Sequence, residues 1–270
     1  MKKIAIATSL LIIFALLLTG CGASSLMSFG IFEDADKYSV GDAVPSAEKI
    51  RKLDVEWVSG SIEIISGGDS VSASEGAGLV SEKSMRWRVD DGVLYVKFCA
   101  SGYSGTFSRD EIAKKSLKVY IPADVDIKVD SVSADVSIKA DGAGVGVGGE
   151  ISLETVSANI TLDGVVGGNV KATSVSGNIG VSSSKIKAAI FESTSGKVAF
   201  SGDAASLKIG TLSGDVSVDL EKTSATVEFI TISGKLRTSL DYTKSDGKFI
   251  FGNGESLVKV NTSSGNLTVK

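Results

Sequence analysis

Residues 210–218, "GTLSGDVSV", decide the fold, because close variants of this stretch recur along the chain. Examples are "TVSANITL" from Thr155 and "TSSGNLTV" from Thr262. Four of the six spacings between successive copies are 18 to 20 residues, and such a period indicates a repeat architecture. Aligned on the serine before the small residue, the copies lie at Ser133, Ser157, Ser176, Ser195, Ser213, Ser233 and Ser264, and an isolated copy lies upstream at Ser59.

Apolar and polar residues alternate on both sides of each serine. Leu207 and Ile209 precede Ser213, for example, and Val216 and Val218 follow it. Period two predicts two half-buried strands per repeat. Burial of each apolar side chain contributes ~1.5–3 kcal/mol, whereas ordering the backbone costs ~1–2 kcal/mol per residue, so one repeat is unstable alone. We therefore predict an all-β fold, a parallel β-solenoid with coils of about 19 residues; a meander of antiparallel hairpins is the alternative.

The residue after the serine is small in every copy, which predicts a sharp corner between the two strands. We interpret these serines and glycines as structural corner residues. The next position should stack into a single row, in which Asp215 would lie between Lys197 and Lys235 and so avoid like-charge neighbours. The small residues are Gly60, Ala134, Ala158, Gly177, Gly196, Gly214, Gly234 and Gly265.

The N-terminus carries a targeting signal. Two lysines precede an apolar run over residues 4–18, which predicts a secretory signal peptide over residues 1–20. The segment 18–21, Leu-Thr-Gly-Cys, resembles the lipobox of bacterial lipoproteins, which implies diacylglyceryl transfer to Cys21 and an acyl chain such as palmitate on the new amine. The alternative is an ordinary signal peptide with a chance cysteine. We expect a lipid anchor in the bacterial cell membrane, on the extracytoplasmic face, followed by a flexible tether over residues 21–49.

Residues 50–126 differ from the repeats at 127–270, and we predict that they form an N-terminal β cap. The sequence around Asp90-Asp91-Gly92 predicts a β-hairpin. The cap aromatics should plug the open end of the stack, although they could instead line a ligand site. The insertion at 241–256 should form a matching hairpin or loop at the other end. The cap aromatics are Trp87, Tyr95, Phe98, Tyr103, Phe107 and Tyr120.

The sequence argues against several kinds of site. It contains no histidine, which excludes a Ser-His-Asp triad. Residues 182–185 match S-x-x-K, but no K-T-G follows, and the glycine-rich stretch 144–152 lacks the lysine of a phosphate loop. A weak calcium site at Asp141, Asp163 and Asp203 is the alternative to three solvated carboxylates.

Cysteine content and net charge narrow the function further. Cys99 would have no disulfide partner if Cys21 is acylated, and we expect it to fill a small space rather than to react. The formal net charge of −4 does not favour nucleic acid. We expect no catalytic residue, no metal and no cofactor.

The strand ending "KVYIP" and the segment "DIKVDSVSADVSIKA" are followed by successive T-[VLI]-S-G-[DNK]-[VIL] units. Over residues 50–270 this pattern resembles the DUF4097 family, whose members are labelled β-strand-repeat proteins or adhesins. The resemblance implies a β-solenoid on the outer face of the bacterial cytoplasmic membrane, with no established active site. We therefore expect a lipid-anchored, non-catalytic binding, adhesin-like or envelope-scaffolding module. Its partner would be an envelope protein or polysaccharide, and the alternative is a β-helical enzyme acting on cell-wall or extracellular polysaccharide.

Overall fold

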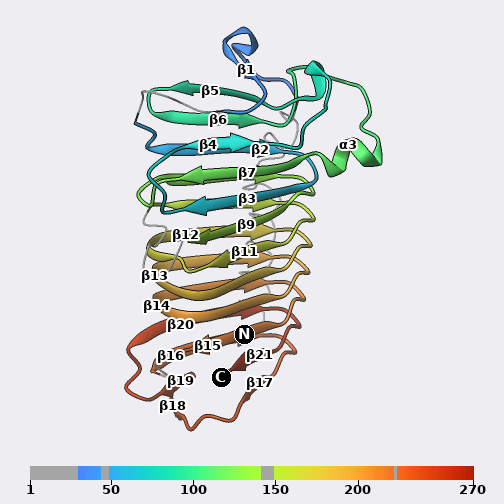
Figure 1. Ribbon diagram of the computed structural model, residues 1–270. Helices are drawn as coiled ribbons and strands as arrows, with labels where there is room; N and C mark the ends of the chain where they lie inside the picture. Colours follow the sequence, from blue (N-terminus) through green and yellow to red (C-terminus); the bar gives the residue numbers. More distant parts are fainter. Residues whose placement is uncertain (1–29, 44–48, 141–148, 222–223) are drawn as a thin grey trace.

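The computed structural model describes residues 30–43, 49–140, 149–221 and 224–270 (Figure 1). The predicted signal peptide and Cys21 lie outside these residues. The prediction of an all-β fold is confirmed, because the described residues form 21 strands with very little helix. No helix in these ranges has the length and hydropathy needed to cross a membrane. The helices are η1 (Ala35–Lys37), η2 (Ser81–Lys83) and α3 (Arg109–Ala113).

The strands that precede the corners pair with one another and form a first column. Every pairing within this column is parallel. In spatial order the column contains β6 (Val93–Lys97), β2 (Lys52–Trp57), β8 (Asp126–Ser131), β10 (Ile151–Thr155), β12 (Val166–Ser174), the end of β13 (Ile179–Ser193), the end of β14 (Val198–Thr211), β20 (Ser256–Thr262) and β16 (Ala225–Thr231).

The strands that follow the corners form a second parallel column. One strand of each column and the corner that joins them make one layer of the stack in Figure 1. The order of the second column is β7 (Ser116–Ile121), β3 (Ser61–Ser66), β9 (Asp135–Ala140), β11 (Ile160–Asp163), the start of β13, the start of β14, β15 (Val216–Leu220), β21 (Leu267–Val269) and β17 (Leu236–Thr238).

The register places equivalent repeat positions side by side. Leu153 pairs with Val129 on one side and with Ala172 on the other, and all three side chains are fully buried. The rings of Phe191 and Phe200 pack across the interior with their centroids 6.3 Å apart. The inward apolar residues therefore form one continuous core along the stack, as the alternation of the sequence requires.

The spatial order of the layers differs from the chain order at both ends. The layer of β20 and β21 lies between the layer of β14 and β15 and that of β16 and β17, although it comes last in the chain. At the other end, β2 and β3 lie between β6 and β7 on one side and β8 and β9 on the other. The predicted cap therefore contributes two layers to the same stack.

Both predicted hairpins are present. β5 (Arg86–Asp90) pairs antiparallel with β6, with Trp87 opposite Val96, and Asp91 and Gly92 adopt positive φ in the turn. In the insertion, β18 (Thr243–Ser245) pairs with β19 (Lys248–Phe251), which covers the edge of β16. Two short strands complete the cap: β1 (Ser39–Val40) on β5, and β4 (Ser72–Ser74) on β7.

Part of the segment expected to be a tether packs on the cap. The Phe32 and Tyr38 rings lie 4.7 Å apart, and the Arg88 guanidinium lies over the Tyr38 ring. The Phe32 backbone N–H donates to Ser101 Oγ at 3.0 Å. The segment packs here because the hairpin offers apolar and cationic surface to the two aromatic side chains. The described residues 30–43 of the segment predicted as a tether therefore contact the cap.

Candidate functional site

The corner serines lie in one line along the stack. The Ser157 backbone N–H donates to the Val132 carbonyl at 3.0 Å, and that of Ser176 donates to Val156 at 3.0 Å. A Cβ added at Gly177 would overlap the carbonyl oxygen of Ala158, so close approach of neighbouring corners, rather than a positive φ, requires glycine there. The corner serines from Ser133 onward thus hold adjacent layers together through their backbone N–H groups.

A row of buried hydroxyls, which sequence reasoning missed, lies behind these corners. The Gly196 N–H donates to Ser193 Oγ at 2.9 Å, and Thr211 Oγ1 donates to Thr262 Oγ1 at 3.0 Å. The available signal was a serine or threonine two residues before each corner serine. The row contains Ser131, Thr155, Ser174, Ser193, Thr211, Thr262 and Thr231.

The position after each corner glycine forms a third row, on the surface. The Asn159 N–H donates to Asp135 Oδ1 at 2.8 Å, and the Asn178 N–H donates to Asn159 Oδ1 at 3.0 Å. The prediction that Asp215 lies between Lys197 and Lys235 is wrong. Asn266 lies between Asp215 and Lys235, because the layer of β20 and β21 is inserted there.

A shallow groove of about 500 Å³ follows the outer face of the second column over β3, β9, β11 and β13. Small and polar residues line it together with Ile62, Val136 and Ile160, and no aromatic residue is among them. Each layer contributes the same two outward repeat positions. These positions are Ser61 and Glu63, Asp135 and Ser137, Asn159 and Thr161, and Asn178 and Gly180.

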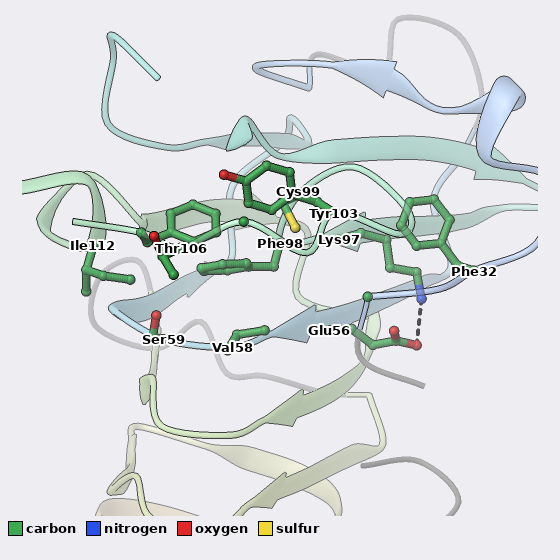
Figure 2. Close-up of a pocket in the computed structure, with 13 residues that line it drawn as sticks. Phe32, Glu56, Val58, Ser59, Lys97, Phe98, Cys99, Tyr103, Thr106 and Ile112 are labelled. Atoms are coloured by element: carbon green, nitrogen blue, oxygen red, sulfur yellow. Dashed lines mark ion pairs between the residues drawn. The ribbon is translucent and has the colours of Figure 1, made fainter. Parts of the chain in front are cut away.

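A deeper pocket of about 450 Å³ lies at the cap, and we call it the cap pocket (Figure 2). The Phe98 and Phe107 rings lie 5.0 Å apart, and those of Tyr103 and Phe107 lie 5.6 Å apart. Of the six cap aromatics, these three line the pocket and the others do not. The pocket is lined by Gly30, Phe32, Glu56, Val58, Ser59, Lys97, Phe98, Cys99, Tyr103, Gly105, Thr106, Phe107 and Ile112.

Charged side chains at the cap pocket are paired. The Lys97 ammonium lies 2.5 Å from Glu56 (Figure 2), and Lys83, which lies over the Phe107 ring, is 2.6 Å from Glu111. The hydrogen bond from Lys83 is the main cause that lowers the pKa of Glu111 to about 2. The rim of the pocket is therefore close to neutral.

Beneath the pocket, Lys115 is fully buried and pairs with Glu75. Its ammonium lies 4.6 Å from the Trp57 ring centroid and 4.5 Å from that of Phe98. Burial lowers the pKa of Lys115, and the hydrogen bond that its ammonium donates to Glu75 opposes this shift. Sequence reasoning missed this pair, because nothing in the pattern around Lys115 indicates that its side chain points inward.

Cys99 is a free, buried cysteine on the wall of the pocket. Burial raises the pKa of its thiol, and Sγ lies 3.6 Å from the Ala100 carbonyl oxygen. A raised pKa keeps the group as a thiol, and only the thiolate is a strong nucleophile. These observations favour a packing role.

Carboxylates and lysines gather on the outer face of the first column, where β2 and β8 adjoin. Lys128 lies 2.7 Å from Asp130 and 3.8 Å from Asp54. Burial raises the pKa of Asp54. The sequence did not predict this cluster. The Ser59 copy lies far upstream of the other copies, and nothing in the sequence indicated that β2, the strand before Ser59, pairs with β8.

The structure describes the S-x-x-K match and part of the acidic and glycine-rich stretches considered from the sequence. Asp163 accepts a hydrogen bond from Ser182 Oγ at 2.8 Å, which ties the first serine of the S-x-x-K match to a carboxylate. Asp141 lies outside the described residues, as does most of the glycine-rich stretch. Within the described ranges, no group of three or more histidine, cysteine or acidic residues is placed to hold a metal ion.

Comparison with known families identifies the chain. The model of the family described as Toastrack DUF4097 matches residues 50–249 and 197–270. The chain belongs to the DUF4097 (Toastrack) family. The match spans both the cap and the repeats, so it contains every residue that lines the groove and all residues that line the cap pocket except Gly30 and Phe32.

Solved structures similar to this Toastrack chain come from three bacteria. A "putative adhesin" from Bacteroides fragilis is 14% identical, with a TM-score of 0.42, over 86% of this chain and 97% of that one. A "putative adhesin" from Parabacteroides merdae is 11% identical, with a TM-score of 0.32, over 87% and 96%. A "putative cell adhesion protein" from Clostridium sporogenes is 12% identical, with a TM-score of 0.29, over 87% and 99%. No curated protein matches the chain.

Proposed function

We propose that this chain is a lipid-anchored, extracytoplasmic β-solenoid that acts as a non-catalytic binding or scaffolding module. The groove along β3, β9, β11 and β13, with its repeated polar positions, is the observation that carries the proposal. Parallel pairing of equivalent positions in successive copies supports the solenoid. The lipobox resemblance at Cys21 supports the anchor, with a bacterial membrane as the site of attachment.

The groove suits an extended polymer better than a compact ligand. It is long and shallow, and adjacent parallel strands present equivalent groups about 4.8 Å apart. Asn159 and Asn178 each use Oδ1 as an acceptor and Nδ2 as a donor along the row. Each amide nitrogen keeps a second donor hydrogen, and each carboxylate has several acceptor sites. Such contacts are weak singly and add along a chain that binds several layers at once. An envelope polysaccharide or an extended protein segment is the partner that fits.

The carboxylate cluster at Asp54 favours a second function, hydrolysis or cleavage of a polysaccharide. Glycosidases commonly use two carboxyl groups, one of them with a raised pKa, and burial raises the pKa of Asp54. Against this function, Glu56 and Asp130 each pair with a lysine. We rank the binding module first, because both carboxylates that line the groove are already engaged. Glu63 pairs with Lys118 and Lys139, and Asp135 accepts a hydrogen bond from the Asn159 N–H.

The test is a pull-down from bacterial envelope extracts with the full mature chain. Thr161→Arg places a long side chain in the groove. Ser217→Arg is the matched control, because Ser217 occupies the same repeat position outside the groove. We expect Thr161→Arg to lose the captured partner and Ser217→Arg to keep it. Equal capture by both variants would reject the groove. Release of reducing sugars that Asp54→Asn abolishes would establish the enzyme instead.

A further inference from the structure

The corners from Ser133 onward each donate two backbone hydrogen bonds to the neighbouring layer, and at several corners the serine hydroxyl donates a third. At the Ser133 corner, the Val132 N–H donates to the Trp57 carbonyl at 3.1 Å, and the Ser133 N–H and Oγ donate to the Val58 carbonyl at 2.8 and 3.0 Å. The Ser157 corner repeats this pattern toward the carbonyls of Ser131 and Val132. The carbonyls of one corner thus satisfy the donors of the next.

The Ser59 corner breaks this pattern. In the layer above it, β6 and β7 are joined by residues 98–115, which contain α3 instead of a serine-glycine corner. Among the described residues, the Val58 N–H, the Ser59 N–H and the Ser59 hydroxyl have no hydrogen-bond partner. The hydroxyl row behind the corner ends here as well, because Trp57 replaces the usual serine or threonine.

The unpaired donors face the cap pocket. Val58 and Ser59 both line it, and the Ser59 side chain points toward Thr106 on the opposite wall (Figure 2). The remaining walls are mainly apolar, with Phe98 and Ile112 among them. The lysines at the rim are paired with glutamates. The polar groups that remain available to a ligand are therefore the hydrogen-bond donors of Val58 and Ser59, which lie beside an apolar surface.

We propose that the cap pocket binds a neutral acyl compound, in which an amide or ester carbonyl is joined to an aromatic or branched alkyl group. Its carbonyl oxygen would accept from the Ser59 N–H and Ser59 Oγ, in place of the corner carbonyl that the layer above lacks, and would lie beside the Val58 N–H. Its apolar group would contact Phe98, Phe107 and Ile112. Small-molecule sites typically have volumes of roughly 300–1,000 Å³ and combine apolar walls with a few placed polar groups, and a volume of about 450 Å³ is within that range.

The test uses 3-phenylpropanamide as the probe and amide NMR of the ¹⁵N-labelled full chain as the readout. The matched probe is 3-phenylpropan-1-amine, which has the same ring and carbon chain but, as an ammonium ion, no acceptor. We expect the amide to shift the Val58 and Ser59 N–H signals in a saturable way and the amine to leave them in place. No saturable shift at these residues, or equal shifts with both probes, would overturn the proposal.

Three variants locate the site. Ser59→Ala removes one donor and should weaken binding of the amide about fivefold, the effect of one hydrogen bond of ~1 kcal/mol. Ser157→Ala removes the equivalent hydroxyl of another corner and should leave the affinity unchanged. Thr106→Trp, at an exposed position on the pocket wall, should abolish binding. Equal affinities for the two alanine variants, or undiminished binding to Thr106→Trp, would reject the site.

This inference is independent of the groove. Thr161→Arg should leave binding of 3-phenylpropanamide unchanged, and Ser59→Ala should leave polymer capture unchanged. Failure of one proposal is therefore distinguishable from failure of the other.

Discussion

The Asn266 backbone N–H donates to Asp215 Oδ1 at 2.8 Å, although the two residues are 51 positions apart in the chain. The Asn266 side-chain amide donates to the same oxygen at 3.0 Å, and Asn266 Oδ1 accepts from the Lys235 N–H at 3.2 Å. Asn266 therefore links the layers on either side of it, which are the layers of Ser213 and Ser233.

Replacement of Asn266 tests this link. Asn266→Ala removes the bond to Lys235 and one of the two bonds to Asp215, so we expect a loss of about 1–2 kcal/mol in the free energy of unfolding. Hydrogen exchange should accelerate in β16 and β17. Asn178→Ala, at the same row position in the middle of the stack, is the control and should leave exchange in β16 and β17 unchanged. Equal acceleration in the two variants would contradict the link.

The stability of the C-terminal layers should depend on pH through Asp215. Hydrogen bonds from Asn266, first from its backbone, lower the pKa of Asp215 below its ordinary value of 3.8. A carboxylate with a depressed folded pKa stabilises the fold above its unfolded pKa, and this contribution is lost as the pH falls through the folded pKa. A ¹³C NMR titration should find the Asp215 pKa below 3.8, and Asn266→Ala should raise it. An unchanged pKa in the variant would show that another group causes the shift.

Close packing of neighbouring corners requires glycine, and the loss of stability on substitution measures how strict this requirement is. A Cβ at Gly196 would overlap the Gly177 carbonyl oxygen, so Gly196→Ala should cost about 1–3 kcal/mol through overpacking. At Gly180 the nearest described atom would be the Ile160 carbonyl oxygen, 4.0 Å away, and Gly180→Ala should change stability little. Thermal unfolding compares the two, and similar melting temperatures would contradict the close approach of the corners.

The buried pair of Lys115 and Glu75 should be essential to the cap. Lys115→Met leaves a buried carboxylate without its partner, a change that typically costs about 3–5 kcal/mol. The double variant Lys115→Met with Glu75→Gln should recover part of that loss, because no charge is left behind. Near-ultraviolet circular dichroism of Trp57 and thermal unfolding report the effect. A double variant less stable than Lys115→Met would show that the charge on Glu75 is not the cause.

The proposed anchor has a direct test. Cys21→Ala should move the protein from the detergent phase to the aqueous phase, because the acyl chains would be absent. Cys99→Ala is the control, since it removes the buried thiol and should leave partitioning unchanged. Unaltered partitioning of Cys21→Ala would reject lipidation.

The apolar core was predictable from the sequence, and the order of the layers was not. Period two places Leu207 and Ile209 inward in any arrangement that stacks equivalent positions. The Ser233 and Ser264 copies, however, carry nearly the same pattern, so either could pair beside Ser213. The choice depends on the path of the insertion between them, and no local propensity encodes that path.

The cap pocket was less predictable than the groove. The groove follows from repeat positions, and Asn159 and Thr161 could have been placed on one face from spacing alone. The pocket exists because residues 98–115 take a longer route than a corner, which leaves Ser59 without the usual acceptors. Only Trp57, at a position where other copies have serine or threonine, distinguishes this corner in the sequence.

Insertion of β20 and β21 has a consequence for synthesis. The layer of β16 and β17, residues 225–238, pairs with the rest of the stack only through β20 and β21. Its native neighbours are therefore absent until residues 256–269 have been synthesised. A nascent chain therefore cannot complete this end in the order of translation. A chain shortened at residue 255 would lack the layer that lies between β14 and β15 on one side and β16 and β17 on the other, so strand edges would be left without their native partners. Such unpaired edges are templates for aggregation, so a small deletion here would be more harmful than its length suggests.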